Sequence, residues 1–297
     1  LIKGADWFVS GAAGVAGWLR VPAVVIGLTI VAMGTSAPEM SVSLVGALKG
    51  QSGISVGNII GSNLFNLLCV GGLAAIIMPM RVESILIKRD IPISLLAVIL
   101  FVLFSLGGNL TRCGGISLLL LFGVFLFLLF REAGKARKVQ AAPDAATLLP
   151  VWKCIIFVII GLAGVVAGGE FVVRSATEIA LNFGLSQSLV GLTIVALGTS
   201  LPEFVTTLVA AKKGENDIAM GNIIGSNIFN LALVLGAAAT IRPLAVAGFV
   251  LIDTVFLAAV TVLLLFFLWK EKTLKSRHGI IFFLLYLAYL IYIINRG

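Results

Sequence analysis

The chain has 297 residues, of which 60% are hydrophobic and only 11% are charged, and its mean hydropathy is +1.16. Soluble domains contain roughly 45–50% apolar residues, so this composition excludes an ordinary soluble protein and indicates an integral membrane protein. The net charge of +8 would suit nucleic-acid binding, but most basic residues fall on one side of the hydrophobic segments, which makes that interpretation unnecessary.

Ten hydrophobic segments follow one another between charged breaks or breaks marked by Pro and Gly. They lie at about residues 1–18, 22–48, 54–79, 91–108, 114–131, 151–178, 186–211, 217–241, 246–270 and 279–295. Most are near the ~20 residues that a helix needs to cross a bilayer, and such continuous runs predict helices because a β-barrel would show short alternating segments. We therefore predict an all-α integral membrane protein with ten transmembrane helices. The first segment is short, and we expect the first helix to be N-terminally incomplete.

The basic residues divide unequally between the two sides of these segments. If the chain starts outside, one side holds Arg20, Arg81, Lys88, Arg89, Arg131, Lys135, Arg137, Lys138, Lys153, Lys212, Lys213, Lys270, Lys272, Lys275 and Arg277. The positive-inside rule assigns this side to the cytoplasm. We thus expect a multi-pass protein of the plasma (cytoplasmic) membrane, with residues 131–150 as a cytoplasmic linker between the regions 1–130 and 151–297.

The chain contains an internal repeat. A displacement of 164 residues without a gap aligns "GLTIVAMGTSAPE" (27–39) with "GLTIVALGTSLPE" (191–203), and "VGNIIGSNLFN" (56–66) with "MGNIIGSNIFN" (220–230). Each copy holds five predicted spans, an odd number, so the second copy must enter the membrane from the opposite side. Two inverted-topology five-helix repeats of this kind indicate a secondary transporter with its site at the midplane between them.

Each repeat carries a glutamate deep inside a predicted span. Glu39 and Glu203 lie some 25 Å along their helices at ~1.5 Å per residue, each directly after a helix-breaking proline, Pro38 or Pro202. The missing proline N–H frees a carbonyl one turn earlier, and hydroxyls precede it at Thr35, Ser36, Thr199 and Ser200. An isolated carboxylate at this depth is costly, and carboxylates, carbonyls and hydroxyls are the ligands that hard cations such as Ca²⁺ and Na⁺ prefer.

The second motif supplies further polar groups. Ser62 and Asn66 are four residues apart, as are Ser226 and Asn230, so each pair shares one helix face. We interpret these four residues as part of the ion site, because two inverted copies would face each other across it. The remaining asparagines of the motif are interpreted as interhelical hydrogen-bonding residues; they are Asn58, Asn63, Asn222 and Asn227.

Together the paired motifs resemble the alpha repeats of the cation/Ca²⁺ antiporter superfamily, in particular its prokaryotic sodium/calcium exchangers, over nearly the whole chain. The resemblance implies ten helices in two inverted fives and an ion site formed by Thr35, Ser36, Glu39, Ser62, Asn66, Thr199, Ser200, Glu203, Ser226 and Asn230, with backbone carbonyls near Ala32 and Ala196. Some sodium/calcium exchangers carry aspartate at the position of Asn230. The site here would hold two formal charges, which leaves the counter-ion and the stoichiometry open.

The expected function is therefore antiport of Ca²⁺ for Na⁺ by alternating access. The alternatives are an H⁺-coupled antiporter of Ca²⁺ or another divalent cation and, less favoured, a cation channel, although channels usually gather identical subunits around one pore. We expect no enzyme activity, no cofactor, no nucleic acid and no obligate protein partner, so that the lipid bilayer and the transported ions are the partners of a functional monomer.

Three other features carry structural expectations. Asp6 with Lys3, and Glu170 with Arg174, have helix-compatible spacings in equivalent spans and predict structural ion pairs. The resemblance implies that these two helices, the first and the sixth, slide as the gate. His278, the single histidine, lies at a basic edge and is expected to be an interfacial residue.

Overall fold

A computed structural model describes residues 1–139, 149–183 and 198–296, which are nearly all helical. The first half consists of α1 (Ile2–Leu19), α2 (Ala23–Ile26), η1 (Gly27–Val31), α3 (Ala32–Thr35), α4 (Ala37–Leu48), α5 (Ser52–Leu64), η2 (Phe65–Val70), α6 (Gly71–Ile77), β1 (Met80–Arg81), η3 (Leu86–Asp90), α7 (Ile91–Ser105), β2 (Asn109–Leu110) and α8 (Arg112–Val139). The segments labelled η are π-helical.

The second half repeats this order. It consists of α9 (Val151–Asn182), α12 (Leu201–Lys212), α13 (Asn216–Ile228), η5 (Phe229–Leu235), α14 (Gly236–Ile241), β3 (Leu244–Ala245), α15 (Gly248–Glu271), β4 (Thr273–Leu274) and α16 (Ser276–Arg296). The helices α4 and α5 and the strand β1 recur as α12, α13 and β3 at a displacement of 164 residues. The repeat predicted from sequence is therefore also a repeat of secondary structure.

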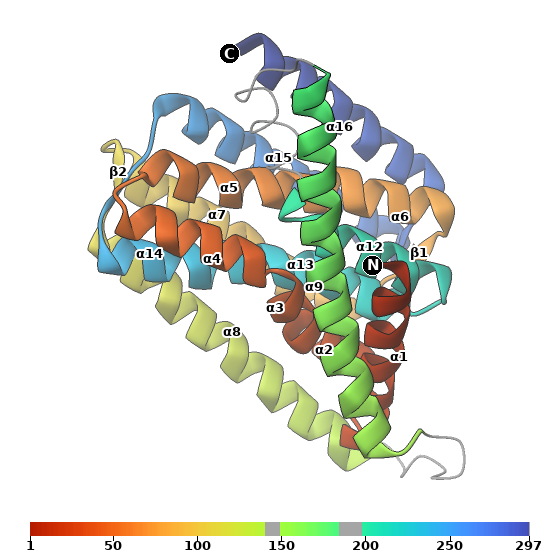
Figure 1. The fold of residues 1–297 in the computed structure, drawn as a ribbon. Helices are drawn as coiled ribbons and strands as arrows, with labels where there is room; N and C mark the ends of the chain where they lie inside the picture. Colours follow the sequence, from red (N-terminus) through yellow and green to blue (C-terminus); the bar gives the residue numbers. More distant parts are fainter. Residues whose placement is uncertain (140–148, 184–197, 297) are drawn as a thin grey trace.

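Two short antiparallel ribbons join the halves. Strand β1 pairs with β4 through Met80 and Leu274, and β2 pairs with β3 through Leu110 and Leu244. Each ribbon thus contains one strand from each half, and Figure 1 places β1 and β2 at opposite ends of the helical bundle. Equivalent parts of the two halves consequently lie at opposite ends of the molecule.

The second predicted span is a broken helix. Ala23–Thr35 and Ala37–Leu48 meet at an angle of 52°, with Pro38 in the first turn of α4. A proline is tolerated there because the first N–H groups of a helix have no intrahelical partner, whereas it interrupts a continuous helix. Pro202 occupies the same place in α12. The break predicted from Pro38 is confirmed, and the part of the second copy at residues 184–197 lies outside the described residues.

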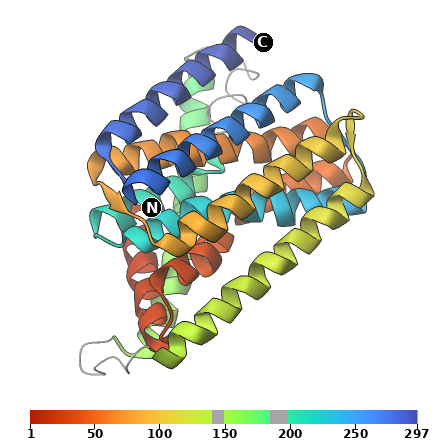
Figure 2. The same ribbon diagram turned by 180° about the vertical axis from the view of Figure 1, so that it is seen from behind.

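The centre of the bundle is formed by the repeated motif helices. Ser52–Ile77 and Asn216–Ile241 are 78% and 94% buried over their most apolar stretches, whereas Val151–Asn182 is only 17% buried. Helix α9 packs along α1, and both cross the direction of α4, α5 and α13 (Figure 1). Figure 2 shows α7, α8 and α15 on the opposite face. The polar motifs are therefore enclosed, and the long apolar helices surround them.

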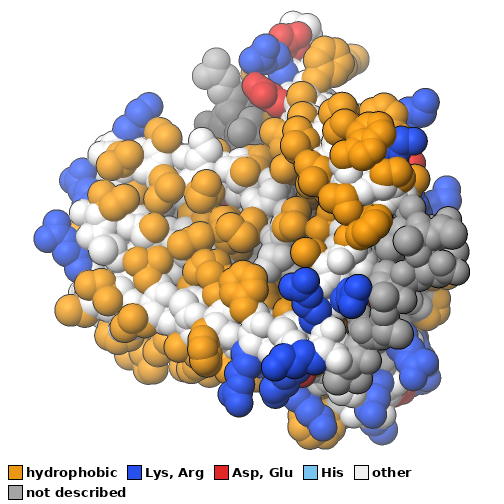
Figure 3. Space-filling model, turned by 90° about the horizontal axis from the view of Figure 1, so that it is seen from below, with side chains coloured by type: hydrophobic (Ala, Val, Ile, Leu, Met, Phe, Trp, Pro, Cys, Tyr) orange, Lys and Arg blue, Asp and Glu red, His pale blue; other side chains and the backbone are white. Residues whose placement is uncertain are grey.

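The outer surface fits a lipid environment. Hydrophobic side chains spread over much of the face in Figure 3, with Lys and Arg gathered mainly toward its edges. Six helices of the described residues are long and apolar enough to cross a membrane, or seven if the broken helix is one span. These findings agree with a multi-pass membrane protein, and the number of ten spans stays a prediction.

The expected ion pairs are found in part. Glu170 pairs with Arg174 at 3.6 Å, as predicted. The predicted pairing of Asp6 with Lys3 is wrong, because Asp6 pairs with Lys213 at 2.6 Å. Lys213 is the C-cap residue of α12, and its ammonium also donates to the Ser10 hydroxyl of α1 at 2.6 Å. A tertiary contact has here replaced a local one.

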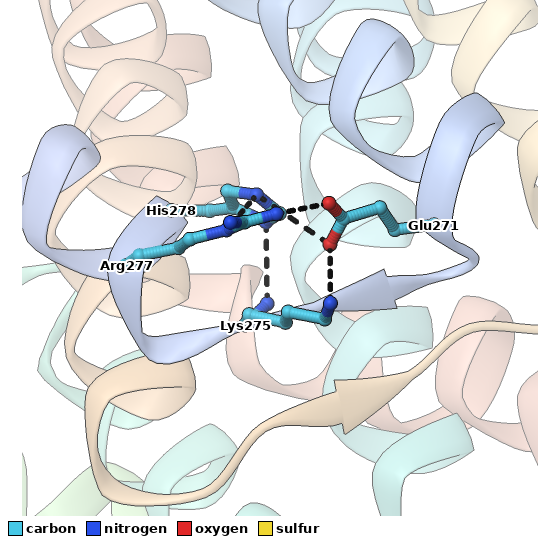
Figure 4. Close-up of polar contacts among 4 residues, drawn as sticks. All are labelled: Glu271, Lys275, Arg277 and His278. Carbon is cyan, nitrogen blue, oxygen red and sulfur yellow. Dashed lines mark hydrogen bonds and ion pairs between the residues drawn. The ribbon is translucent and has the colours of Figure 1, made fainter.

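His278 packs inside the turn between α15 and α16. Its ring is 4% exposed and is stacked on Phe267 with 4.2 Å between the ring centroids. The backbone N–H of Lys275 donates to its Nδ1 at 3.3 Å. As Figure 4 shows, the Glu271 carboxylate accepts from Lys275 at 2.9 Å and from Arg277 beside the imidazole. The histidine thus helps to order the turn, a role that its position in the sequence did not predict.

Candidate ion-binding site

The site lies where the N-termini of α4 and α12 meet the two motif helices, Ser52–Ile77 and Asn216–Ile241. Glu39 is in the first turn of α4 and Glu203 is in the first turn of α12. They are 0% and 1% exposed. The free N–H groups and the dipole of a helix N-terminus favour negative charge in its first turn, so both carboxylates lie where their helices can hold them.

Each glutamate is bound by a serine of the other half. The Ser36 hydroxyl donates to Glu203 Oε1 at 2.7 Å, and the Ser200 hydroxyl donates to Glu39 Oε1 at 2.7 Å. Ser62 adds a longer contact of 3.4 Å to Glu39 Oε1. The crossed serine bonds bring Glu39 and Glu203 to one place between the halves.

The threonines of the motif form a second crossed pair. Thr35 donates to Asn222 Oδ1 at 3.1 Å, and Thr199 donates to Asn58 Oδ1 at 3.4 Å. The Asn58 amide in turn donates to the backbone carbonyl of Glu39 at 3.2 Å. Asn58 and Asn222 therefore connect helices, as the sequence interpretation states, and they also support the backbone beneath the carboxylates.

Two further supporting residues were missed in the sequence. Ser43 Oγ and Thr207 Oγ1 accept hydrogen bonds from the amides of Asn58 and Asn222 at 3.0 and 2.9 Å. Both are buried, and they are displaced from each other by the repeat distance. A hydroxyl at both copies of one position was the signal that could have identified them.

Several oxygen atoms at the site are buried without a hydrogen-bond partner among the described residues. They are Glu39 Oε2, Glu203 Oε2, Asn66 Oδ1, Asn230 Oδ1 and Ser226 Oγ. Buried polar atoms are normally paired, so these unpaired acceptors on the predicted ligands need an explanation. Each of these oxygens can coordinate a cation through a lone pair, which is the chemistry expected of an ion site.

The remaining predicted ligands are the two alanine carbonyls. The carbonyl oxygen of Ala32 accepts from the backbone N–H of Ser36 at 3.0 Å and lies 3.3 Å from the Thr35 hydroxyl. Both contacts lie within the helical turn that precedes the break, so the role of this carbonyl as a ligand stays a prediction. Ala196 falls outside the described residues.

Comparison with known proteins gives a consistent result. The sequence model of the family described as "Sodium/calcium exchanger protein" matches residues 1–131 and 153–295. The sodium/calcium exchanger MaX1 of Methanosarcina acetivorans is 33% identical over 98% of this chain and 94% of its own length. The inner membrane protein YrbG of Escherichia coli is 38% identical over 82% of this chain and 77% of its own length.

A solved structure shows the same fold. The sodium-calcium exchanger NCX_Mj, soaked with 2.5 mM Na⁺ and 0.1 mM Ca²⁺, superimposes with a TM-score of 0.86 at 34% identity, covering 97% of this chain and 93% of the other. The family match, the relatives and the shared fold all indicate the same family. This chain belongs to the sodium/calcium exchanger family of membrane antiporters.

Proposed function

We propose that the chain exchanges Ca²⁺ for Na⁺ across the membrane by alternating access at the site between its halves. The observation that carries this proposal is the pair of buried carboxylates, Glu39 and Glu203, each bound by a serine of the other half. The proposed ligands are these two residues with Thr35, Ser36, Ser62, Asn66, Thr199, Ser200, Ser226, Asn230 and the carbonyls of Ala32 and Ala196.

Charge and ligand chemistry support Ca²⁺ as one substrate. Ca²⁺ takes six to eight oxygen ligands, and two carboxylates match its charge. Two buried ionised carboxylates without a counter-charge would cost much free energy, so a bound divalent cation would stabilise them by making the site electrically neutral. Because serines from opposite halves bind the two carboxylates, a relative movement of the halves would change the ligand set from both sides. In alternating access, movement of one half against the other changes the access to the site, so ligands contributed by both halves fit this mechanism.

The membrane arrangement is proposed on the same basis. The two antiparallel ribbons, each with one strand from each half, lie at opposite ends of the bundle. This arrangement supports ten spans in two inverted repeats, residues 1–130 and 151–297. The linker 131–150 is then cytoplasmic by the positive-inside rule, in a multi-pass protein of the plasma membrane that functions as a monomer.

The counter-ion is the part that the ligand set constrains least. Names of MaX1 and NCX_Mj state sodium/calcium exchange, which favours Na⁺. Asn66 and Asn230 are neutral, however, so two carboxylates balance two monovalent ions and leave a third unbalanced. This observation keeps H⁺-coupled exchange as a second candidate. Asn230→Asp would restore a third carboxylate and is expected to change the reversal potential of Ca²⁺ flux.

Ion flux distinguishes the candidates. Proteoliposomes that contain the purified chain are loaded with Na⁺, or set to an acidic interior, and the uptake of external ⁴⁵Ca²⁺ is followed. Saturable uptake driven by the outward Na⁺ gradient is the expected result. Uptake driven only by the outward H⁺ gradient would assign H⁺ as the counter-ion. An uptake rate that is the same with and without either gradient would reject antiport.

A further inference from the structure

Four buried asparagines meet where the two motif helices cross. Asn63 and Asn66 come from the junction of α5 with η2, and Asn227 and Asn230 come from the junction of α13 with η5. All four are at most 1% exposed. Asn66 and Asn230 belong to the proposed ligand set, whereas Asn63 and Asn227 do not.

Asn63 and Asn227 bind each other's backbone. The side-chain Nδ2 of Asn63 donates to the carbonyl oxygen of Asn227 at 3.1 Å, and Nδ2 of Asn227 donates to the carbonyl oxygen of Asn63 at 3.3 Å. An amide has one donor end and one acceptor end. These reciprocal bonds fix the donor ends, and therefore they also fix where the two Oδ1 atoms lie.

The fixed oxygens hold the ligand asparagines. Oδ1 of Asn63 accepts from Nδ2 of Asn230 at 3.1 Å, and Oδ1 of Asn227 accepts from Nδ2 of Asn66 at 3.4 Å. With their nitrogens held, Asn66 and Asn230 keep their own Oδ1 atoms free, and these are the atoms that lack a partner among the described residues. If either amide turned over, an N–H group would replace an oxygen and repel a cation.

We propose that Asn63 and Asn227 are positioning residues that orient the amides of Asn230 and Asn66, so that both present oxygen to the transported cation. Each ligand amide is held by the opposite repeat, which makes the orientation of both depend on how the halves fit together. The proposal rests on the proposed function, because it assigns a role in the same ion site.

The arrangement also matches asparagine at position 230. A carboxylate there would have no N–H to offer to Asn63 Oδ1, and two acceptor oxygens would face each other in a buried place. Asn63 thus favours an amide over an ionised carboxylate at position 230. The neutral amide of Asn230 therefore supplies the N–H donor that Asn63 in the other half requires.

A double-mutant cycle separates orientation from simple helix packing. The variants are Asn63→Leu, which has a similar size and no polar atoms, Asn230→Ala, and their combination. The readouts are Ca²⁺ binding to the purified full chain by calorimetry and thermal stability. We expect Asn63→Leu to weaken Ca²⁺ binding roughly tenfold, about the effect of one hydrogen-bonded ligand. In the Asn230→Ala background, Asn63→Leu should have no further effect on binding, because the amide that it orients is absent.

Two results would overturn the proposal. One is unchanged Ca²⁺ affinity in Asn63→Leu, and the other is an equal loss in the presence and absence of Asn230, since packing alone would produce either. Val260→Ala is the packing control, because Val260 is buried in α15, which carries none of the proposed ligands, and it should lower stability without changing affinity. If Asn63→Leu does not fold, the equivalent cycle of Asn227→Ser with Asn66→Ala applies the same criteria.

This experiment also distinguishes failure of the proposed function from failure of the positioning role alone. A parent chain that binds no Ca²⁺ would reject the proposed function and the positioning role together. A parent chain that binds Ca²⁺ with an additive cycle would reject the positioning role alone. Binding is measured with Ca²⁺ as the single ligand, so the result does not depend on which counter-ion drives transport.

Discussion

Replacing Glu39 or Glu203 by glutamine tests the ion site most severely, because it removes one charge and changes little else. Both side chains are at most 1% exposed, so water cannot substitute for a lost carboxylate. We expect Glu39→Gln and Glu203→Gln each to abolish exchange while the chain still folds. Insertion into the membrane should if anything become easier with one buried charge fewer.

The expected loss of affinity follows from the burial. Removing one partner of a buried, hydrogen-bonded charge pair costs about 3–5 kcal/mol. At 1.4 kcal/mol per factor of ten, Ca²⁺ binding should weaken by roughly two to four orders of magnitude. The glutamine oxygen can still accept the serine hydrogen bond, so the loss reflects the missing charge more than a lost contact.

Calorimetric Ca²⁺ titration and ⁴⁵Ca²⁺ uptake by proteoliposomes measure this effect. Glu132→Gln is the matched control, because Glu132 is 40% exposed in a surface pair with Lys135, and surface ion pairs contribute little. The control should transport like the parent. Parent-like affinity and flux in either Glu39→Gln or Glu203→Gln would refute the assignment of the site.

Three smaller perturbations test other contacts. Ser36→Ala removes the hydroxyl bound to Glu203 at 2.7 Å and should weaken Ca²⁺ binding roughly tenfold in a calorimetric titration; an unchanged affinity would show that the cross-repeat bond is dispensable. Asp6→Asn breaks the pair with Lys213 between α1 and α12 and should change the exchange rate by no more than about fivefold. The charge-swapped double variant, Asp6→Lys with Lys213→Asp, should restore the exchange rate toward that of the parent. An exchange rate no closer to the parent than that of Asp6→Asn would show that the ion pair does not influence exchange. Burial, and then the Asp217 carboxylate, raise the pKa of Glu83, so the folded chain holds this proton more tightly than the unfolded chain and ionised Glu83 costs stability at neutral pH. Glu83→Gln should therefore raise the Tm near pH 7, with a gain that fades as the pH falls toward about 4; a gain that is independent of pH would contradict the explanation.

The sequence predicted the features that depend on local residue patterns. Pro38 predicted the helix break because a missing N–H acts on its own turn. The closely similar motifs around Glu39 and Glu203 predicted two equivalent places because similar sequences fold alike. The spacing of Ser62 and Asn66 placed both on one helix face, where Ser62 contacts Glu39 and Asn66 faces Asn227.

Features that depend on distant partners could not be predicted in this way. Nothing near Ser36 indicates that it binds Glu203 instead of Glu39, since that choice follows from how the two halves pack. Lys213 likewise takes Asp6 from a distance of 207 residues along the chain, whereas spacing favoured Lys3. The π-helical segments that begin at Phe65 and Phe229 also went unpredicted, although they start at equivalent positions of the two copies.

Locating the bound cation tests directly whether both ions exchange between Glu39 and Glu203. Crystals of the chain soaked with Sr²⁺ as a substitute for Ca²⁺ give an anomalous-difference map that marks the divalent ion. We expect a peak bounded by the carboxylates of Glu39 and Glu203 and the amide oxygens of Asn66 and Asn230, and we expect it to disappear when Na⁺ is raised at constant Sr²⁺. A peak elsewhere with none between the two glutamates, or one that high Na⁺ leaves unchanged, would contradict exchange of both ions at this site.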